Sequence, residues 1–119
     1  MKHYIRTLSL FLFISFAFTQ TQLGSDIDGE AAGDYFGTSV SMNSAGDRIA
    51  IGADYNDGTA SDAGHVRVYE YSNSSWTQLG SDIDGEAASD NSGISVSMNA
   101  AGDRVAIGAN KNDGPGNGR

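Results

Sequence analysis

Closely spaced carboxylates are the residues of this sequence best suited to chemistry. The same acidic cluster occurs twice, as Asp26, Asp28, Glu30 and Asp34 and again as Asp82, Asp84, Glu86 and Asp90. Calcium is bound by about six to eight oxygens from carboxylates and carbonyl groups. The candidate metal ligands are Asp26, Asp28, Asp82 and Asp84. The alternative, which we prefer, is a solvated turn, because Asp-Gly sequences are typical of turns.

The remaining polar and aromatic side chains do not predict catalysis. His65 has no cysteine, second histidine or serine placed to act with it, so we expect it only to begin a strand. Trp76 with Tyr69 and Tyr71 could form a sugar-stacking surface. Packing along a pair of strands explains these aromatics as well, and we favour that interpretation. No acid–base pair or activated nucleophile is visible, and we predict a protein that is not an enzyme.

A long internal repeat must position these residues. The segment Phe36–Ala53, FGTSVSMNSAGDRIAIGA, returns as Ser92–Ala109, SGISVSMNAAGDRVAIGA. Matching residues such as Gly37 and Gly93 are 56 positions apart. A period of this size indicates propeller blades, a solenoid or a tandem array.

The repeat unit predicts strands and no helices. Short alternating runs lie between clusters of Gly, Asn, Asp and Ser, the pattern of an all-β protein. One period contains four expected strands, Gly37–Met42, Arg48–Ala53, His65–Tyr71 and Ser75–Leu79. In the first two strands, one face has large apolar residues and the other has Ser, Ala and Gly. Large side chains of one sheet can fill the space left by small ones of the next. We therefore predict four-stranded antiparallel β-propeller blades, with about one and a half blades present.

The N-terminal segment predicts export. Lys2 and Arg6 precede the apolar run Leu8–Phe18, which is shorter than the roughly 20 residues of a membrane span and is typical of a signal peptide. We expect residues 1–19 to be a signal peptide, residues 20–79 a first blade with a preceding strand at Thr21–Leu23, and residues 80–119 a truncated second blade. The mature chain would have no membrane span and would be secreted or at the cell surface.

The charge of the chain narrows the classes of partner, and its cysteine content indicates how the fold is stabilised. The formal net charge is -8 at pH 7, which disfavours binding to the phosphates of nucleic acids. We expect no nucleic-acid partner. The sequence has no cysteine, so packing rather than disulfide bonds must stabilise the fold.

Two short motifs carry a resemblance to a known family. Phe36–Val40 (FGTSV), followed by Ile49–Ala53 (IAIGA), resembles the FG-GAP repeat of the integrin α-chain N-terminal β-propeller and of its bacterial extracellular relatives. The segment Gly64–Tyr69 resembles the third strand of that blade. Many members carry a calcium loop between the first two strands. Here that turn, Asn43–Asp47, is short and poor in carboxylates, so we do not carry the calcium site over and expect no cofactor.

The resemblance implies a binding function. It suggests an exported, non-catalytic module for adhesion or for binding an extracellular protein or glycan. The alternatives are a structural surface spacer and a propeller portion attached to a secreted enzyme. Differences between the two copies gather around Gly33–Thr38 and Asp54–Ala63, which favours ligand-reading loops. Propellers have typically about 4–8 blades, so we expect the partners to include further blades of the same protein.

Overall fold

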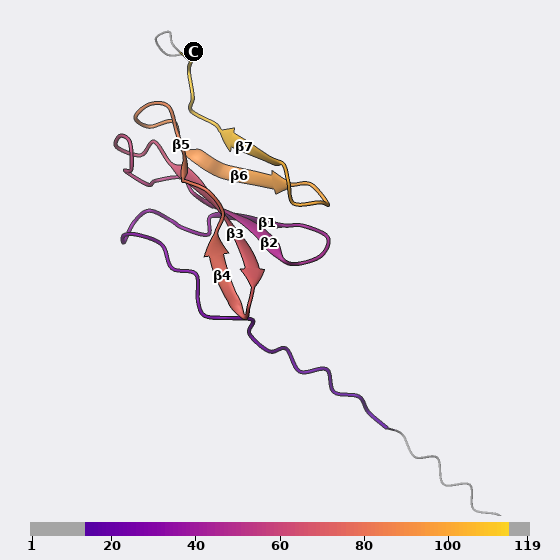
Figure 1. Ribbon diagram of the computed structural model, residues 1–119. Coiled ribbons are helices and arrows are strands. Elements are labelled where there is room, and N and C mark those ends of the chain that lie inside the picture. Colours follow the sequence, from indigo (N-terminus) through magenta and orange to yellow (C-terminus); the bar gives the residue numbers. More distant parts are fainter. Residues whose placement is uncertain (1–13, 115–119) are drawn as a thin grey trace, which may run out of the picture.

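The computed structural model describes residues 14–114, which contain strands and no helix (Figure 1). The strands are β1 (Ser39–Met42), β2 (Arg48–Ala53), β3 (His65–Ser72), β4 (Ser75–Gln78), β5 (Ile83–Asp84), β6 (Ser92–Met98) and β7 (Val105–Ala109). The predicted all-β fold class is confirmed. Residues 14–114 contain no helix that is long and apolar enough to span a membrane. Of the expected signal peptide, residues 1–13 lie outside the described residues.

The first sheet contains the four predicted strands of one repeat. Strands β1, β2, β3 and β4 pair in that order, each antiparallel to the next. The turn from β1 to β2 is closed by Asn43, whose Oδ1 accepts hydrogen bonds from the backbone N–H of Asp47 at 3.1 Å and of Arg48 at 3.0 Å. Asn99 closes the equivalent turn of the second repeat in the same way. An Asx side chain that bonds the backbone ahead of it is a local signal, so both copies fold alike.

Strand β5 extends the first sheet beyond the predicted strands. It pairs with the beginning of β3, where Val66 lies opposite Ile83, while Tyr69 lies opposite Gln78 on β4. Between these two pairs, the chain that runs from β4 to β5 has two more residues than β3. Residues 79–82 form a loop that takes up this extra length. This bulge-like break turns the side chain of Asp82 back over β3. Strand β5 falls within residues 80–119, so the first sheet includes a strand from the expected second blade.

The expected strand at Thr21–Leu23 does not form, although this segment copies β4 in sequence. A strand needs a neighbour for its backbone hydrogen bonds, and β4 has β3 as its partner. The copy is held instead by one side chain. The indole N–H of Trp76 donates to the carbonyl oxygen of Leu23 at 2.9 Å. Residues 14–22 run away from the sheets (Figure 1).

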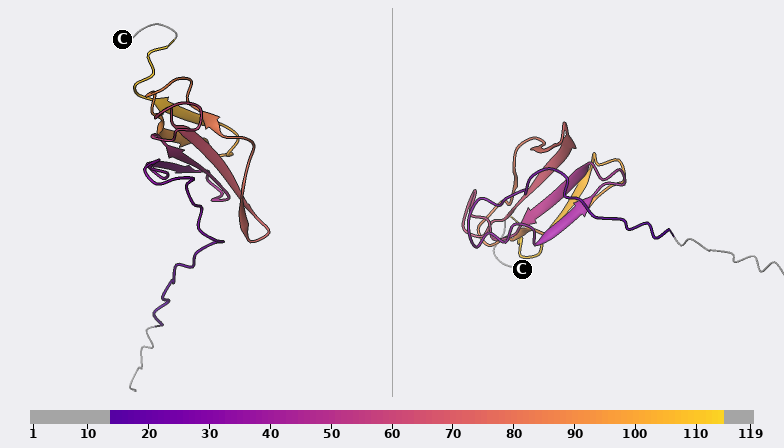
Figure 2. Two further views of the ribbon diagram at one scale, coloured as in Figure 1. Left: turned by 90° about the vertical axis from the view of Figure 1, so that its left-hand side faces the viewer. Right: turned by 90° about the horizontal axis from the view of Figure 1, so that it is seen from below.

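The second sheet is the hairpin β6–β7, which stacks on one face of the first sheet (Figure 2). The contact places large residues of the second sheet on small residues of the first. Ala50, Val66 and Met98 are buried at its centre. The half-buried residues packed around them are Val68, Val96, Val105 and Ile107. This is the large-on-small stacking that the alternation of side chains in the sequence predicted.

Gly52 shows how closely the two sheets approach. A Cβ atom at this position would collide with the backbone carbonyl oxygen of Gly93 on β6. The hydroxyl of Ser39, beside Gly52 on β1, donates to the same carbonyl oxygen at 2.6 Å. The small face of the first sheet thus both admits the second sheet and supplies hydrogen bonds to it.

Candidate functional site

The four predicted metal ligands make different contacts in the structure. Asp26 accepts a hydrogen bond from Gln22 at 2.8 Å, and Asp82 accepts the equivalent bond from Gln78 at 2.7 Å. Asp28 and Asp84 are exposed. Within residues 14–114, the one set of three side chains that could hold a metal ion contains Asp82 but none of the other three candidates.

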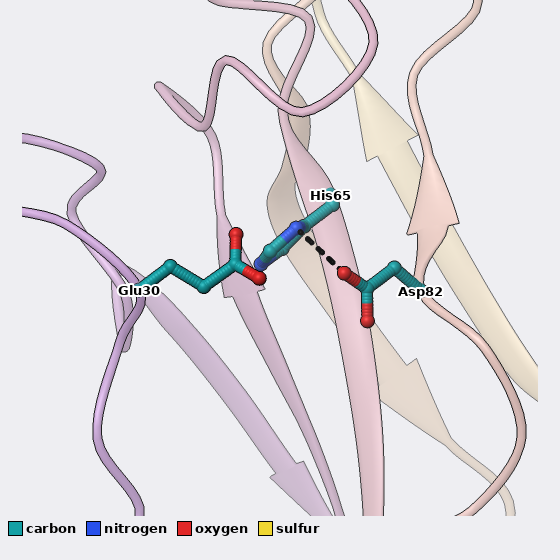
Figure 3. Close-up of side chains that lie close together, drawn as sticks. All are labelled: Glu30, His65 and Asp82. Carbon is teal, nitrogen blue, oxygen red and sulfur yellow. Dashed lines mark ion pairs between the residues drawn. The ribbon is translucent and has the colours of Figure 1, made fainter.

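That set joins three parts of the chain (Figure 3). Glu30 comes from the segment before β1, His65 from the start of β3, and Asp82 from the loop between β4 and β5, with ligand atoms within 4.8 Å of one another. His65 is 1% exposed, and its Nδ1 lies 3.6 Å from Asp82 Oδ2. His65 begins a strand as predicted. Its carboxylate neighbours come from loops that no pattern in the sequence placed beside it.

Arg67 already provides the positive charge of this cluster. Its guanidinium makes two hydrogen bonds of 2.8 Å to Asp82, from Nε and from Nη2, and a further ion pair to Glu30. Two parallel bonds from arginine to one carboxylate form a strong and geometrically defined pair. A metal ion bound by the same oxygens would lie beside this guanidinium, and the repulsion between the two cations disfavours it. We therefore interpret the cluster as an ion-pair clamp.

The clamp changes the pKa of both carboxyls in the same direction. Hydrogen bonds from Arg67 lower the pKa of Asp82 from an ordinary 3.8 to about 2. They also lower the pKa of Glu30, with a smaller contribution from Asn56. Both acids are thus ionised at neutral pH. Because Glu30 belongs to the first acidic cluster and Asp82 to the second, Arg67 ties the two repeats together.

The turn where the resemblance would place a calcium loop is closed by its own side chains. In the turn Asn43–Asp47, Asn43 Oδ1 accepts from two backbone N–H groups, and its Nδ2 donates to Asp47 Oδ1 at 2.7 Å. These oxygens are committed to holding the turn closed. A calcium loop presents several oxygens toward one point, and this turn does not.

Tyr71 of β3 and Trp76 of β4 pack on each other. Tyr71 lies opposite Trp76 across the strand pair, with ring centroids 5.2 Å apart. Tyr69 is buried, at 9% exposure. Their role as packing residues, which we favoured over a sugar-stacking surface, agrees with this arrangement.

Hydrogen bonds draw three loops together at one end of the stacked sheets. The loops comprise residues 30–38, 54–64 and 85–91. Asn56, which is 3% exposed, donates to Asp34 at 2.8 Å, and Asn91 donates to the carbonyl oxygen of Asp54 at 2.9 Å. The backbone of Ser89 bonds that of Ser61 at 2.8 Å. We call this region the loop end. Its buried amide side chains hold exposed neighbours in defined positions.

Two exposed tyrosines meet at the loop end. Tyr35 and Tyr55 are 63% and 38% exposed, and their rings form an edge-to-face pair with centroids 5.1 Å apart. The ammonium of Lys111 lies 6.0 Å from the centre of the Tyr55 ring. Tyrosine offers apolar area with a polar tip, which suits it to contacts with a ligand.

The sequence contains the signal for this pair, although we did not single out the two tyrosines. Each occupies a position where the near-identical repeats differ, because Asn91 stands in place of Tyr35 and Lys111 in place of Tyr55. Tyr35 has φ of 54°, as does Asn91. Asparagine tolerates this left-handed conformation, whereas a bulky residue adopts it at a cost. A strained tyrosine on an exposed loop points to a role other than packing.

Comparison with known proteins finds one family match. Residues 25–69 match the family model described as FG-GAP repeat. The chain contains an FG-GAP repeat. The match runs from the first acidic cluster through β1 and β2 to Tyr69 on β3, and its residues align with the second copy 56 positions later. Neither the search of curated proteins nor that of solved structures found a match.

Proteins with FG-GAP repeats share some general properties. The FG-GAP repeat is a non-catalytic repeat of β-propeller type, and it is typically extracellular. The stacked antiparallel sheets of the structure are consistent with partial propeller blades.

Proposed function

We propose that this chain is an exported, non-catalytic FG-GAP module that binds an extracellular protein or glycan through its loop end. The observation that carries the proposal is the Tyr35–Tyr55 pair. It is exposed, it sits on loops fixed by buried hydrogen bonds, and it occurs in only one of the two repeats. A spacer gains nothing from placing aromatic rings in solvent at the positions where its repeats diverge.

The chemistry of the pair suggests how a ligand would be held. A rigid tyrosine gives a large contact area and loses little conformational entropy on binding. Lys111, beside the Tyr55 ring, adds a positive charge that would favour a ligand with carboxylate or sulfate groups. Adhesion through such a contact would be the biological outcome.

The repeats themselves provide the variant that tests this function. Tyr35→Asn with Tyr55→Lys introduces the residues that the second repeat carries at the same positions. The substitution at residue 35 also replaces a strained tyrosine with an amino acid that accepts φ of 54°. The fold should therefore be kept. Thr77→Asn, at an exposed position on β4, is the matched control.

The readout is retention on an array of glycans and extracellular matrix proteins. Wild type and Thr77→Asn should bind the same ligand, and the double variant should lose at least about tenfold in affinity, the equivalent of one good contact. Equal binding by all three proteins would show that the tyrosine pair is not the site. No retention of a folded wild type would favour the spacer alternative.

Export is a separate part of the proposal and has its own test. If residues 1–19 are a signal peptide, the chain recovered from the medium or periplasm should begin at Gln20 by intact-mass analysis. A chain recovered only inside the cell, with residues 1–19 present, would contradict secretion.

A further inference from the structure

The contact between the two sheets is built from two different faces. The first sheet contributes a small face on β1 and β2, formed by Ser39, Ser41, Ala50 and Gly52. The second sheet contributes a large face on β6 and β7, formed by Val96, Met98, Val105 and Ile107. The registers of the two hairpins place each set on one side of its sheet, since residues opposite each other across paired strands share a face.

Both faces occur a second time, on the sides of the two sheets that point away from this contact. The small face repeats without change as Ser95, Ser97, Ala106 and Gly108 on the second sheet. The large face repeats as Val40, Met42, Ile49 and Ile51 on the first sheet, with Ile49 as the one replacement, for Val105. Two of the outer residues are open where their counterparts are buried, whereas Ile51 of the outer large face is itself buried, at 5% exposure. Met98 is 9% exposed and Met42 is 48% exposed. Ala50 is fully buried, whereas Ala106 is exposed.

We propose that the large face of one chain docks on the small face of a second copy of this chain, repeating the internal contact between molecules. The occupant follows from continuity with the observed interface. A surface with the sequence of the outer large face is already seated, within this chain, on a surface with the sequence of the outer small face. A second copy is therefore a partner whose hairpin faces match those of the observed contact.

Two hydrogen bonds across the internal contact can be repeated as well. Arg48 Nη1 donates to the carbonyl oxygen of Gly102 at 3.0 Å, and the backbone N–H of Met98 donates to Ser41 Oγ at 2.9 Å. All four residues have identical counterparts. Arg104 would donate to the carbonyl oxygen of Gly46 of the partner subunit, and Ser97 would accept from the backbone N–H of Met42 of the partner subunit.

This association is head to tail, because each copy uses one face to dock and the other to receive. Such a contact generates a ring if the rotation closes and a filament if it does not. It should be weaker than the internal contact. The first sheet also contributes Val66 and Val68 from β3 to the internal core, and the β6–β7 hairpin has no third strand.

Two single variants block the two faces separately. Val40→Asp places a charge on the large face, and Ala106→Lys places one on the small face. Val40 is 59% exposed and Ala106 is exposed, so neither change should unfold the monomer. Thr77→Asp and Ala88→Lys introduce the same charges at exposed positions outside both faces and are the matched controls.

The experiment uses the full chain, expressed with its own N-terminal segment so that any processing takes place. Sedimentation velocity over about two orders of magnitude in concentration measures association. Wild type and both controls should associate reversibly with rising concentration. Each face variant should raise the dissociation constant at least about tenfold, because it buries an unpaired charge.

Mixing the two face variants gives the decisive measurement. Val40→Asp keeps a normal small face and Ala106→Lys keeps a normal large face, so the mixture should associate through these two unmodified faces. An isologous contact, in which both copies use the same face, would not be restored by mixing. The proposal is overturned if wild type stays monomeric, if either face variant associates like wild type, or if the mixture remains monomeric.

Discussion

Met98 and Met42 provide an internal comparison of what sheet stacking contributes to stability. They are the same residue at the same repeat position, but Met98 is 9% exposed between the sheets and Met42 is 48% exposed on the outer face. Full burial of such a side chain contributes about 1.5–3 kcal/mol, and removal leaves a cavity where the surroundings cannot collapse. Met98→Ala should therefore lower the free energy of unfolding by about 2–3 kcal/mol. Met42→Ala should lower it by about 1 kcal/mol or less.

Urea unfolding measures this difference. Trp76, the only tryptophan, reports on β4 by fluorescence, and far-UV circular dichroism reports on all strands. Both signals should be recorded at concentrations where the chain is monomeric, so that any contact at Met42 between copies does not contribute. Coincident curves would support two-state unfolding, which the free-energy comparison requires. If the two variants lost equal stability, stacking of the second sheet on the first would not be the interaction that holds this fold together.

Three further predictions concern close packing, pH and the N-terminal segment. Gly52→Ala should cost about 1–3 kcal/mol, because its Cβ meets a backbone oxygen of the second sheet, and Gly108→Ala should cost less because its Cβ meets only side-chain atoms; equal melting temperatures would refute this. The lowered pKa of Asp82 stabilises the fold above pH 3.8, and this contribution is lost as the pH falls toward 2. This contribution is about 2 kcal/mol without solvent screening and about 1 kcal/mol with it. As the pH falls from above 3.8 toward 2, the free energy of unfolding of Asp82→Asn should therefore decrease by about 1 kcal/mol less than that of the wild type. Trp76→Phe removes the hydrogen bond to Leu23 and should increase proteolysis near that residue, while unchanged cleavage would mean that the bond does not hold the segment.

Local patterns in the sequence determined the strands and their turns. The run Arg48–Ala53 forms β2 with the predicted bounds, and β3 and β4 differ from prediction by one residue at one end. Asn43 and Asn99 close their turns with bonds to residues four and five positions ahead, so the information lies within the segment itself. The alternation of large and small residues also predicted which kind of face meets which, because side chains alternate across a strand.

Tertiary structure alone decided which distant residues share a site. His65, Arg67 and Asp82 meet because two surplus residues between β4 and β5 turn Asp82 back over β3, and Glu30 reaches them from another loop. Tyr35 and Tyr55 become a pair because buried amide groups fix the loops between strands. Loop paths depend on contacts between segments far apart in the chain, and no local period encodes them. The repeat could be predicted from the sequence, whereas the exposed aromatic pair and the ion-pair clamp required the folded chain.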